Sequence, residues 1–199
     1  MKKLLHKIKQ TIIDIQRFIQ YGDLPTSYYI KKGMKVGKHF SRESGTKMDI
    51  SNCWLIEIKD NVKMANRVQI LAHDDAAEPI TGYRKVGKVI IGNNVFIGAG
   101  VTILPGVIIG DNAIIGAGSL VNRSVKPNML VAGVPIKDIK TVDQFIKEAE
   151  EDLRKAELEN RMLDMTYDVN CKPSKEINPD DLKEETSYYF KITRFANQE

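Results

Sequence analysis

A chain of 199 residues is long enough for one well-buried domain with additional elements at its ends. Its formal net charge of +4 is too small to indicate nucleic-acid binding by itself, and its two cysteines lack the CxxC spacing of a zinc site or the pattern of a disulfide framework. We therefore expect a cytoplasmic protein with one main domain that binds no nucleic acid and carries no metal.

Residues 1–30 have the pattern of an amphipathic helix. Large aliphatic residues recur there at helical spacing: Leu4, Leu5, Ile8, Ile12, Ile15 and Ile19. Gly22 and Pro25 predict the end of this helix, and the charged residues between the aliphatic ones exclude a signal peptide and a transmembrane span. Basic residues outnumber acidic ones in this part of the chain, so a peripheral membrane contact is the less favoured alternative to the expected packing of the stripe against the rest of the fold.

The middle of the chain carries a repeat with a period of six residues. One position of the repeat is aliphatic throughout: Ile91, Ile97, Ile103, Ile109, Ile115 and Val121. The position four residues later is apolar or small: Val95, Val101, Val107, Ala113, Ser119 and Val125. A shorter run with the same period precedes a gap: Ile58, Val62, Met64, Val68 and Ile70. Such a period is the signature of a protein built from stacked structural repeats.

A period of six is a multiple of the strand period of two but not of the helical period of 3.6. The same face of a strand therefore recurs at every repeat, whereas on a helix the stripe would drift. The pattern predicts a mainly β solenoid in which stacked coils bury a continuous aliphatic column. The handedness of the solenoid does not follow from the period.

The segment from residue 89 to residue 135, with blocks such as IIGNNVFIG and IIGAG, resembles the hexapeptide-repeat acyltransferases, most of all the galactoside, maltose and surface-polysaccharide O-acetyltransferases. The resemblance implies a left-handed parallel β-helix with N-terminal and C-terminal helices, assembled as a homotrimer that uses acetyl-CoA. We expect this domain to span residues 31–136, with a loop at residues 73–88 that interrupts the repeat.

Residues 137–199 form the C-terminal segment, in which Thr141 and Gln144 predict the start of a helix. Apolar residues at heptad spacing, Val142, Ala149, Ala156 and Leu163, predict either a three-stranded coil in a trimer or packing along the solenoid. Beyond Asp168 the sequence is polar and then offers a strand-like run from Tyr188 to Phe195, for which we have no function.

Acyl transfer to a hydroxyl requires a general base, because an alcohol is a poor nucleophile until its proton is being removed. Of the three histidines, His73 opens the loop that interrupts the repeat, whereas a surface role is expected for His6 and a structural role for His39. Insertions in solenoids are often binding faces, and imidazole titrates near neutrality. By resemblance His73 is the catalytic base; the residue that orients its ring remains open.

The resemblance also implies the donor site. The backbone N–H of Ala99 would hold the oxyanion, and Phe96 stands where relatives often carry a tryptophan beside the catalytic ring. The expected acetyl-CoA-binding residues are Phe96, Gly98, Ala99, Gly116, Ala117, Asn122, Arg123, Lys126, Lys137 and Lys140. Small residues allow the pantetheine arm to approach the backbone, although solenoid corners favour glycine anyway, and the basic side chains suit phosphates.

For the acceptor we expect a sugar hydroxyl, with Asp49, Asn66 and Tyr83 as candidate contacts, and the resemblance suggests a role in surface-polysaccharide synthesis. The alternatives are an antibiotic-modifying acetyltransferase and a non-catalytic solenoid scaffold. A zinc-dependent carbonic anhydrase of this fold would need three converging histidines. A serine acetyltransferase would carry a histidine where this chain has Arg84.

Overall fold

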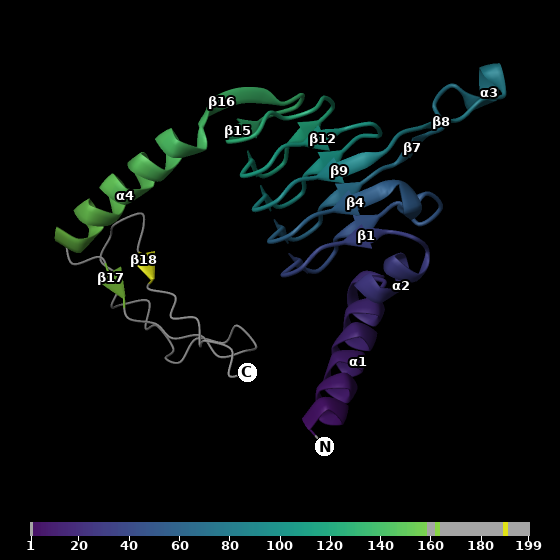
Figure 1. Cartoon of the computed structure of the whole chain (residues 1–199), viewed down its shortest axis with the longest axis horizontal. Helices are drawn as coiled ribbons and strands as arrows, with labels where there is room; N and C mark the ends of the chain where they lie inside the picture. Colours follow the sequence, from purple (N-terminus) through teal and green to yellow (C-terminus); the bar gives the residue numbers. More distant parts are fainter. Residues whose placement is uncertain (1, 159–161, 164–188, 191–199) are drawn as a thin grey trace. The chain divides into compact units, whose positions relative to one another are not determined.

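The computed structural model describes residues 2–158, 162–163 and 189–190 (Figure 1). The chain divides into two compact units, Met1–Asp143 and Gln144–Glu199. The first unit contains two N-terminal helices and the solenoid, and the second contains most of the C-terminal helix.

The N-terminal segment forms α1 (Lys2–Tyr21) and α2 (Thr26–Lys31), which are separated by residues 22–25. Gly22 follows α1 with a positive φ of 66°, and Pro25 precedes α2, so both residues end and separate helices as predicted. The expected burial of the apolar stripe is wrong for the described residues: Ile12 and Ile15 are each 52% exposed and Ile19 is 78% exposed. A helical period alone identifies an apolar face but not its partner.

The solenoid consists of three sheets of parallel strands, and each coil contributes one short strand to each sheet (Figure 1). Sheet A contains β1 (Lys35–Val36), β4 (Ile56–Ile58), β9 (Val89–Ile91) and β12 (Ile108–Ile109). Sheet B contains β2 (Ser41–Arg42), β5 (Lys63–Met64), β10 (Phe96–Ile97), β13 (Ile114–Ile115) and β15 (Met129–Ala132), and is closed by the antiparallel β16 (Lys137–Thr141). Sheet C contains β3 (Lys47–Met48), β6 (Gln69–Ile70), β11 (Thr102–Ile103) and β14 (Leu120–Val121). We name the three edges where the chain turns from one sheet to the next AB, BC and CA.

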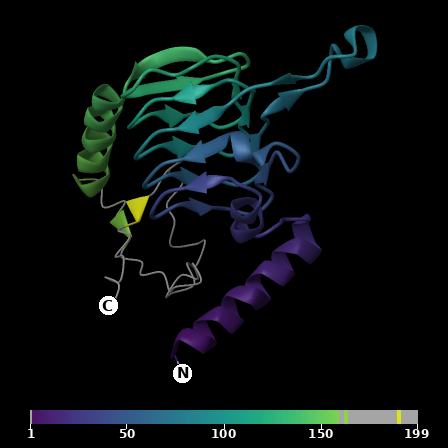
Figure 2. The same ribbon diagram turned by 45° about the vertical axis from the view of Figure 1, so that its right-hand side comes forward.

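The six-residue repeat forms the core, as predicted. Its aliphatic residues from Ile91 to Val121 are at most 1% exposed, and the residues four positions later, from Val95 to Val125, are at most 4% exposed. The earlier run from Ile58 to Ile70 continues the same column one coil below. The fold is the left-handed parallel β-helix that the resemblance implies, and Figure 2 shows its stacked coils from a second side.

Edge AB carries a ladder of asparagines in the left-handed backbone conformation, with φ between 56° and 58°: Asn61, Asn94, Asn112 and Asn128. Each of the first three side chains donates a hydrogen bond to the next, at 3.0, 3.0 and 2.9 Å. Asparagine tolerates this conformation better than most residues because its short amide can bond locally. His39 adopts the same positive φ in the lowest coil, consistent with a structural role.

At edge BC the coils stack too closely for a side chain at Gly98. A Cβ atom there would lie 2.5 Å from the backbone nitrogen of Ala117. Gly116 is likewise closed off, since a Cβ would lie 2.8 Å from the Cβ of Ala132. Stacking therefore explains these two glycines without any bound ligand.

The lower end of the solenoid is closed by polar contacts that the repeat pattern did not predict. Arg42 pairs in register with Met64 and so takes a position that is aliphatic in higher coils. Its guanidinium donates to the carbonyl oxygens of Thr46 and Leu24, the former at 2.9 Å. The buried Asp23 accepts from the backbone N–H of Gly45 at 2.8 Å. Because charged residues replace aliphatic ones at this end of the solenoid, the six-residue hydrophobic repeat cannot be recognised there in the sequence.

The segment between β6 and β9 leaves the solenoid as a loop (Figure 1). Its base is an antiparallel pair, β7 (His73–Asp74) with β8 (Lys85–Val86), and its tip carries the short helix α3 (Glu78–Thr81). A separate 3-10 turn (Cys53–Leu55) links sheet C to sheet A in the coils below. His73 thus lies where the loop joins edge CA.

The second unit contains α4, which begins at Val142, directly after Thr141 as predicted, and ends at Leu158. β17 (Met162–Leu163) and β18 (Tyr189–Phe190) form a parallel pair. The remaining residues of the predicted strand-like run, including Tyr188 and Phe195, lie outside the described residues. Among the described helices none combines the length and the apolar character that crossing a membrane requires.

Candidate active site

His73 is placed by the end of sheet C and by the base of the loop. It is the third residue after β6, and its backbone pairs with Val86 across the β7–β8 ladder. Its side chain is 28% exposed, so one side of the imidazole is packed and the other reaches solvent. That is the arrangement required of a base that must meet a substrate.

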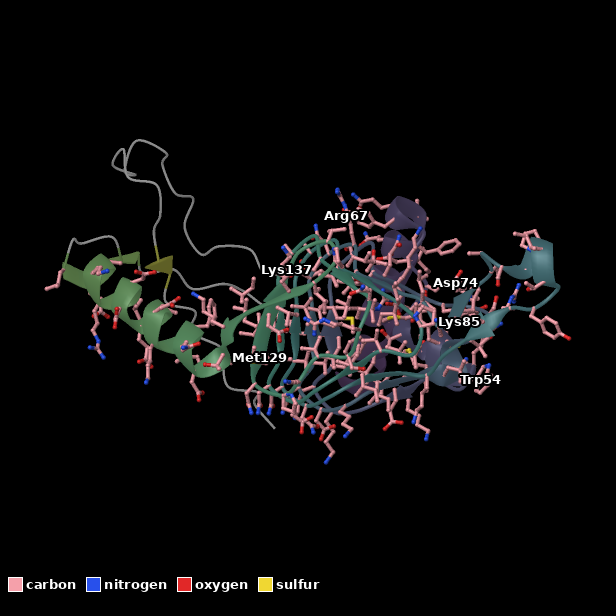
Figure 3. All side chains as sticks on the ribbon, turned by 90° about the horizontal axis from the view of Figure 1, so that it is seen from above. Trp54, Arg67, Asp74, Lys85, Met129 and Lys137 are labelled. Carbon is pink, nitrogen blue, oxygen red and sulfur yellow. The ribbon has the colours of Figure 1, made fainter. Side chains whose placement is uncertain are left out.

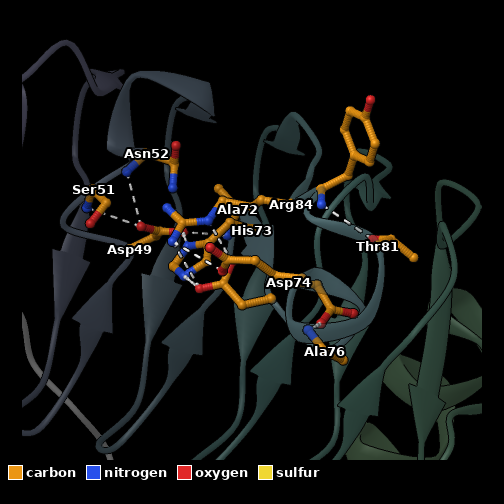
Figure 4. Close-up of polar contacts among 12 residues, drawn as sticks. Asp49, Ser51, Asn52, Ala72, His73, Asp74, Ala76, Thr81 and Arg84 are labelled. Atoms are coloured by element: carbon orange, nitrogen blue, oxygen red, sulfur yellow. Dashed lines mark hydrogen bonds and ion pairs between the residues drawn. The ribbon is translucent and has the colours of Figure 1, made fainter.

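Asp49 is the orienting partner of His73 that the sequence did not identify. Its Oδ2 contacts Nδ1 of His73 (Figure 4). A carboxylate can only accept, so Nδ1 carries the proton and donates it, which leaves Nε2 as the acceptor nitrogen. We had expected Asp49 among the acceptor contacts; its side chain is only 1% exposed and is fully engaged beneath the ring.

The carboxylate of Asp49 is held by backbone groups as well as by His73. Its Oδ1 accepts from the N–H groups of Ser51 at 3.0 Å and Asn52 at 2.9 Å, and its Oδ2 accepts from Ala72 at 3.0 Å. Burial by itself raises the pKa of Asp49, but the hydrogen bonds from His73, Asn52 and Ala72 outweigh burial and leave that pKa below its ordinary value. Asp49 is therefore a fixed, ionised acceptor for the imidazole N–H.

The other side of the ring faces the loop. Oδ2 of Asp75 lies 3.7 Å from Nε2 of His73, and Asp75 is itself held by Arg84, with 2.5 Å between Nε and Oδ1. Figure 4 shows Asp49 on one side of His73 and the loop residue Asp74 on the other. The imidazole is thus placed between a buried carboxylate and a partly exposed one.

Ala99 lies at edge BC, in the turn between β10 and β11. Gly100 follows it with a positive φ of 69° and donates to the carbonyl of Asn66 in the coil below, while the carbonyl of Ala99 accepts from Gly118 in the coil above. Within the part of the chain that the structure describes, the N–H of Ala99 has no acceptor. It is a half-buried backbone donor at edge BC, which suits the expected oxyanion-binding role.

The base and the donor lie on different edges of the same solenoid. His73 belongs to edge CA and Ala99 to edge BC, and all of sheet C separates them. Seen from above, Arg67 of edge BC and Asp74 beside His73 lie at separate corners, and Met129 of edge AB lies toward the third (Figure 3). One chain therefore holds both functional groups without bringing them together.

Comparisons with known proteins agree with this architecture. Residues 88–123 match the family model described as bacterial transferase hexapeptide (six repeats). The chain is 41% identical over 112 residues to a putative acetyltransferase, YvoF, of Bacillus subtilis (strain 168), covering 56% of this chain and 63% of the relative. It is 34% identical over 130 residues to the galactoside O-acetyltransferase of Escherichia coli (strain K12), covering 60% and 59%.

A solved structure of a hexapeptide-repeat-containing acetyltransferase from Vibrio cholerae O1 biovar eltor, complexed with acetyl coenzyme A, superposes with a TM-score of 0.50 at 26% identity. The match covers 55% of this chain and 61% of that one. The solenoid of this chain carries the bacterial transferase hexapeptide repeat at residues 88–123 and is similar to hexapeptide-repeat acetyltransferases. The chain spans about six tenths of the length of these relatives, with 63% and 59% of the two curated proteins matched.

In this hexapeptide-repeat solenoid the residues expected to bind acetyl-CoA are distributed over all three edges. Gly98, Ala99, Gly116 and Ala117 line edge BC, and Lys137 pairs with Ala132 at the upper end of the same edge. Phe96 lies on the outer face of sheet B and is 41% exposed, and Lys140 pairs with Leu130 on that sheet. Asn122 and Arg123 follow β14 at edge CA, whereas Lys126 follows the bridge between Val125 and Ile109 in sheet A.

Arg123, which we expect to bind a phosphate of acetyl-CoA, already forms an ion pair within the chain. Its guanidinium lies 2.8 Å from Oδ1 of Asp138 in β16, and both side chains are nearly half exposed. An exposed ion pair of this kind contributes little stability, so a phosphate can compete for the guanidinium.

The remaining acceptor candidates are not gathered around His73. Asn66 lies at edge BC, directly below Ala99, and Tyr83 is 80% exposed in the loop. Sequence reasoning missed Asp75 as a neighbour of Nε2 of His73 and Arg84 as the partner of Asp75, since nothing in the loop sequence specifies which carboxylate turns toward His73. Among the described residues no cluster of three or more His, Cys, Asp or Glu could hold a metal ion.

Proposed function

We propose that this chain is an acetyl-CoA-dependent O-acetyltransferase that acts as a homotrimer on a sugar hydroxyl. The observation that carries the proposal is the pair formed by Asp49 and His73 at the edge of a hexapeptide-repeat solenoid. Because Nδ1 of His73 donates to Asp49, its Nε2 is free to accept a proton, and the side chain is partly exposed. The galactoside O-acetyltransferase and the acetyl-CoA complex among the relatives support the reaction class.

The chemistry assigns one task to each group. The acceptor hydroxyl donates its proton to Nε2 of His73 while its oxygen attacks the thioester carbonyl, and the imidazolium that forms is stabilised by Asp49. The N–H of Ala99 holds the oxyanion of the tetrahedral intermediate. Collapse of the intermediate breaks the carbon–sulfur bond, and His73 returns the proton to the thiolate of CoA. No metal is needed in this scheme.

A trimer brings the separated edges together. The outward side chains of the upper coils are apolar on sheet A (Ile90 and Ile108) and on sheet B (Phe96, Ile114 and Leu130). On sheet C the same coils present Thr102 and Leu120, so this face is the less apolar one, while the coil below is polar on all three sheets: Glu57, Lys63 and Gln69. If sheet A of one copy packs against sheet B of the next, edge AB faces the threefold axis, and edge CA of one copy meets edge BC of its neighbour.

This packing supplies each site from two copies. His73 of one copy lies next to Ala99 of the next, and Phe96 of the second copy faces the side of the first that carries His73. Asn122 and Arg123 on edge CA then face Lys137 on edge BC, so most of the expected donor-site residues converge. Lys126 does not join them.

The proposal is tested first with acetyl-CoA alone. Titration calorimetry with the purified full chain is expected to show about one binding site per chain, and transfer to a panel of sugars is then followed by thiol release. His73→Asn should lower kcat by about a hundredfold to ten-thousandfold, the usual contribution of a general base. His39→Asn is the matched control: it makes the same change at edge AB, where asparagine is the usual residue, and should leave kcat unchanged.

Absence of acetyl-CoA binding in the wild-type chain would contradict the transferase and favour a scaffold. Binding with transfer to antibiotics but to no sugar would contradict the acceptor class and leave the donor chemistry standing.

A further inference from the structure

Both ring nitrogens of His73 face a carboxylate, but the two distances differ in kind. Asp49 is in direct contact with Nδ1, whereas Oδ2 of Asp75 lies 3.7 Å from Nε2. A separation of 3.7 Å is too long for a hydrogen bond. The catalytic nitrogen and Asp75 therefore lie close to each other without binding each other.

Asp75 is held in this position by the loop itself. Arg84 contacts both of its carboxylate oxygens, with Nε 2.5 Å from Oδ1 and Nη2 3.0 Å from Oδ2. The base of the loop is fixed by the pairs His73–Val86 and Asp74–Lys85 of the β7–β8 ladder. One hydrogen bond and one close ion contact from the same guanidinium hold the carboxylate near the ring.

The chemistry of the two groups defines what can lie between them. An ionised carboxylate accepts hydrogen bonds and cannot donate to Nε2, and Nε2 must itself accept from the reacting hydroxyl. A molecule bound here must therefore offer two donors, one to each acceptor. The short separation requires those donors to be on one atom, as in an ammonium group, or on neighbouring atoms of the carbon skeleton, as in a diol.

We propose that Asp75 is a specificity-determining residue that binds the hydroxyl next to the one acetylated, so that the acceptor is a vicinal diol. The inference rests on the proposed function, because it assigns the second hydroxyl from the position of His73 as base. Arg84 acts through Asp75, as a positioning residue that keeps the carboxylate turned toward the ring.

The test uses small alcohols, so that the natural acceptor need not be known. Acetyl transfer from acetyl-CoA is measured with the full chain for propane-1,2-diol and for propan-1-ol. The wild-type chain should prefer the diol by about tenfold to a hundredfold in kcat/KM, the effect expected of one hydrogen bond to a charged group. Asp75→Ala should bring the ratio close to one while leaving acetyl-CoA affinity unchanged, and any effect of the lost charge on the base itself applies to both alcohols and cancels in the ratio.

Asp74→Ala is the matched control. It removes a carboxylate from the adjacent position, where Oδ1 of Asp74 accepts from the backbone of Ala76 rather than facing His73. It should retain the preference for the diol. Retention of that preference in Asp75→Ala, or its absence in the wild-type chain, would overturn the inference.

Two further outcomes separate this inference from the proposed function. Failure to bind acetyl-CoA would refute the transferase itself. Normal binding together with a preference for 2-aminopropan-1-ol over the diol would overturn only the present inference, because it would identify Asp75 as a site for an ammonium group.

Discussion

The carboxylate of Asp49 contacts Nδ1 of His73 although the two residues are 24 positions apart in the chain. The solenoid register brings them together: Met48 of β3 pairs with Ile70 of β6, so residues just beyond these two strands reach the same edge. The backbone N–H of Ala72 donates to the same carboxylate, which ties the strand end to Asp49 before the loop begins. The pair is therefore a direct consequence of how two coils stack.

Asp49 is expected to act on catalysis through His73 and not through binding. Asp49→Asn replaces an acceptor with a side chain whose NH₂ group can face Nδ1, which favours the tautomer with its proton on Nε2 and removes the acceptor for the substrate proton. We expect kcat to fall by about a hundredfold or more, with the Kd for acetyl-CoA unchanged. Steady-state kinetics and calorimetry on the same preparations measure the two quantities.

Asp111→Asn is the control for this prediction. Asp111 also accepts a backbone hydrogen bond at a solenoid corner, from Asn93 at 2.7 Å, but lies at edge AB. It should change stability without changing kcat. Equal losses of kcat in the two variants would show that Asp49 has a merely structural role.

The solenoid could be predicted from the sequence because the signal is repeated: each inward aliphatic residue is one of many equivalents, and every one of them is buried. His73 could be located for a related reason, since it lies where that repetition breaks. Its partner could not. Asp74 and Asp75 are adjacent to His73 in sequence, whereas Asp49 becomes its neighbour only through the register between coils. Asp49 is not part of the six-residue repeat, so the sequence pattern gives no sign of that register at this position.

The sequence also did not predict where the chain departs from the six-residue repeat or from the expected burial of α1. Arg42 occupies an inward position of the lowest coil and is satisfied by carbonyl groups of Leu24 and Thr46, which lie in segments with no repeat. The aliphatic stripe of α1 predicted burial, yet Ile12 remains half exposed. In both cases the deciding factor is a tertiary contact, or the lack of one among the described residues, and local periodicity carries no information on either.

A site shared between copies predicts complementation. The variant His73→Asn lacks the proposed base, and the variant Ala99→Pro lacks the backbone N–H that would hold the oxyanion. Proline is suited to that turn because Pro105 precedes Gly106, which has a positive φ of 85°, at the equivalent position of another corner. Each variant alone should be nearly inactive.

Chains of the two variants, unfolded together and refolded at equal concentration, should recover about a quarter of wild-type activity, because random assembly pairs an intact His73 with an intact Ala99 at that frequency. Ser44→Pro, at the same turn before Gly45 in the lowest coil, controls for the proline itself and should remain active. Mixtures no more active than the separate variants would place both groups of each site in one chain.

The hydrogen bonds to Asp49 predict a loss of stability in acid. Because the pKa of this carboxyl is below its ordinary value in the folded protein, its contribution is fully present above the unfolded pKa of about 3.9 and is lost as the pH falls through the folded pKa. The difference in Tm between the wild-type chain and Asp49→Asn should therefore be constant from about pH 5 to 7 and shrink below about pH 4. Thermal unfolding at one protein concentration measures it, and a difference that persists unchanged at low pH would contradict the prediction.

The asparagine ladder predicts an unusual order of stability at Asn112. This residue has a φ of 57°, accepts a hydrogen bond from Asn94 and donates one to Asn128. Asn112→Gly and Asn112→Ala remove both bonds equally, and any contact of the side chain with a second copy is lost equally too. Alanine additionally suffers the left-handed conformation, which costs about 1–2 kcal/mol, while glycine loses about 0.5–1 kcal/mol through the greater freedom of its unfolded chain. We therefore expect the alanine variant to be less stable by about 0.5–1 kcal/mol in urea denaturation at fixed protein concentration, the reverse of the order found inside helices. An alanine variant as stable as the glycine variant would mean that this turn relaxes out of the left-handed region once its amide is gone, and that the side-chain ladder, not the backbone, holds edge AB in register.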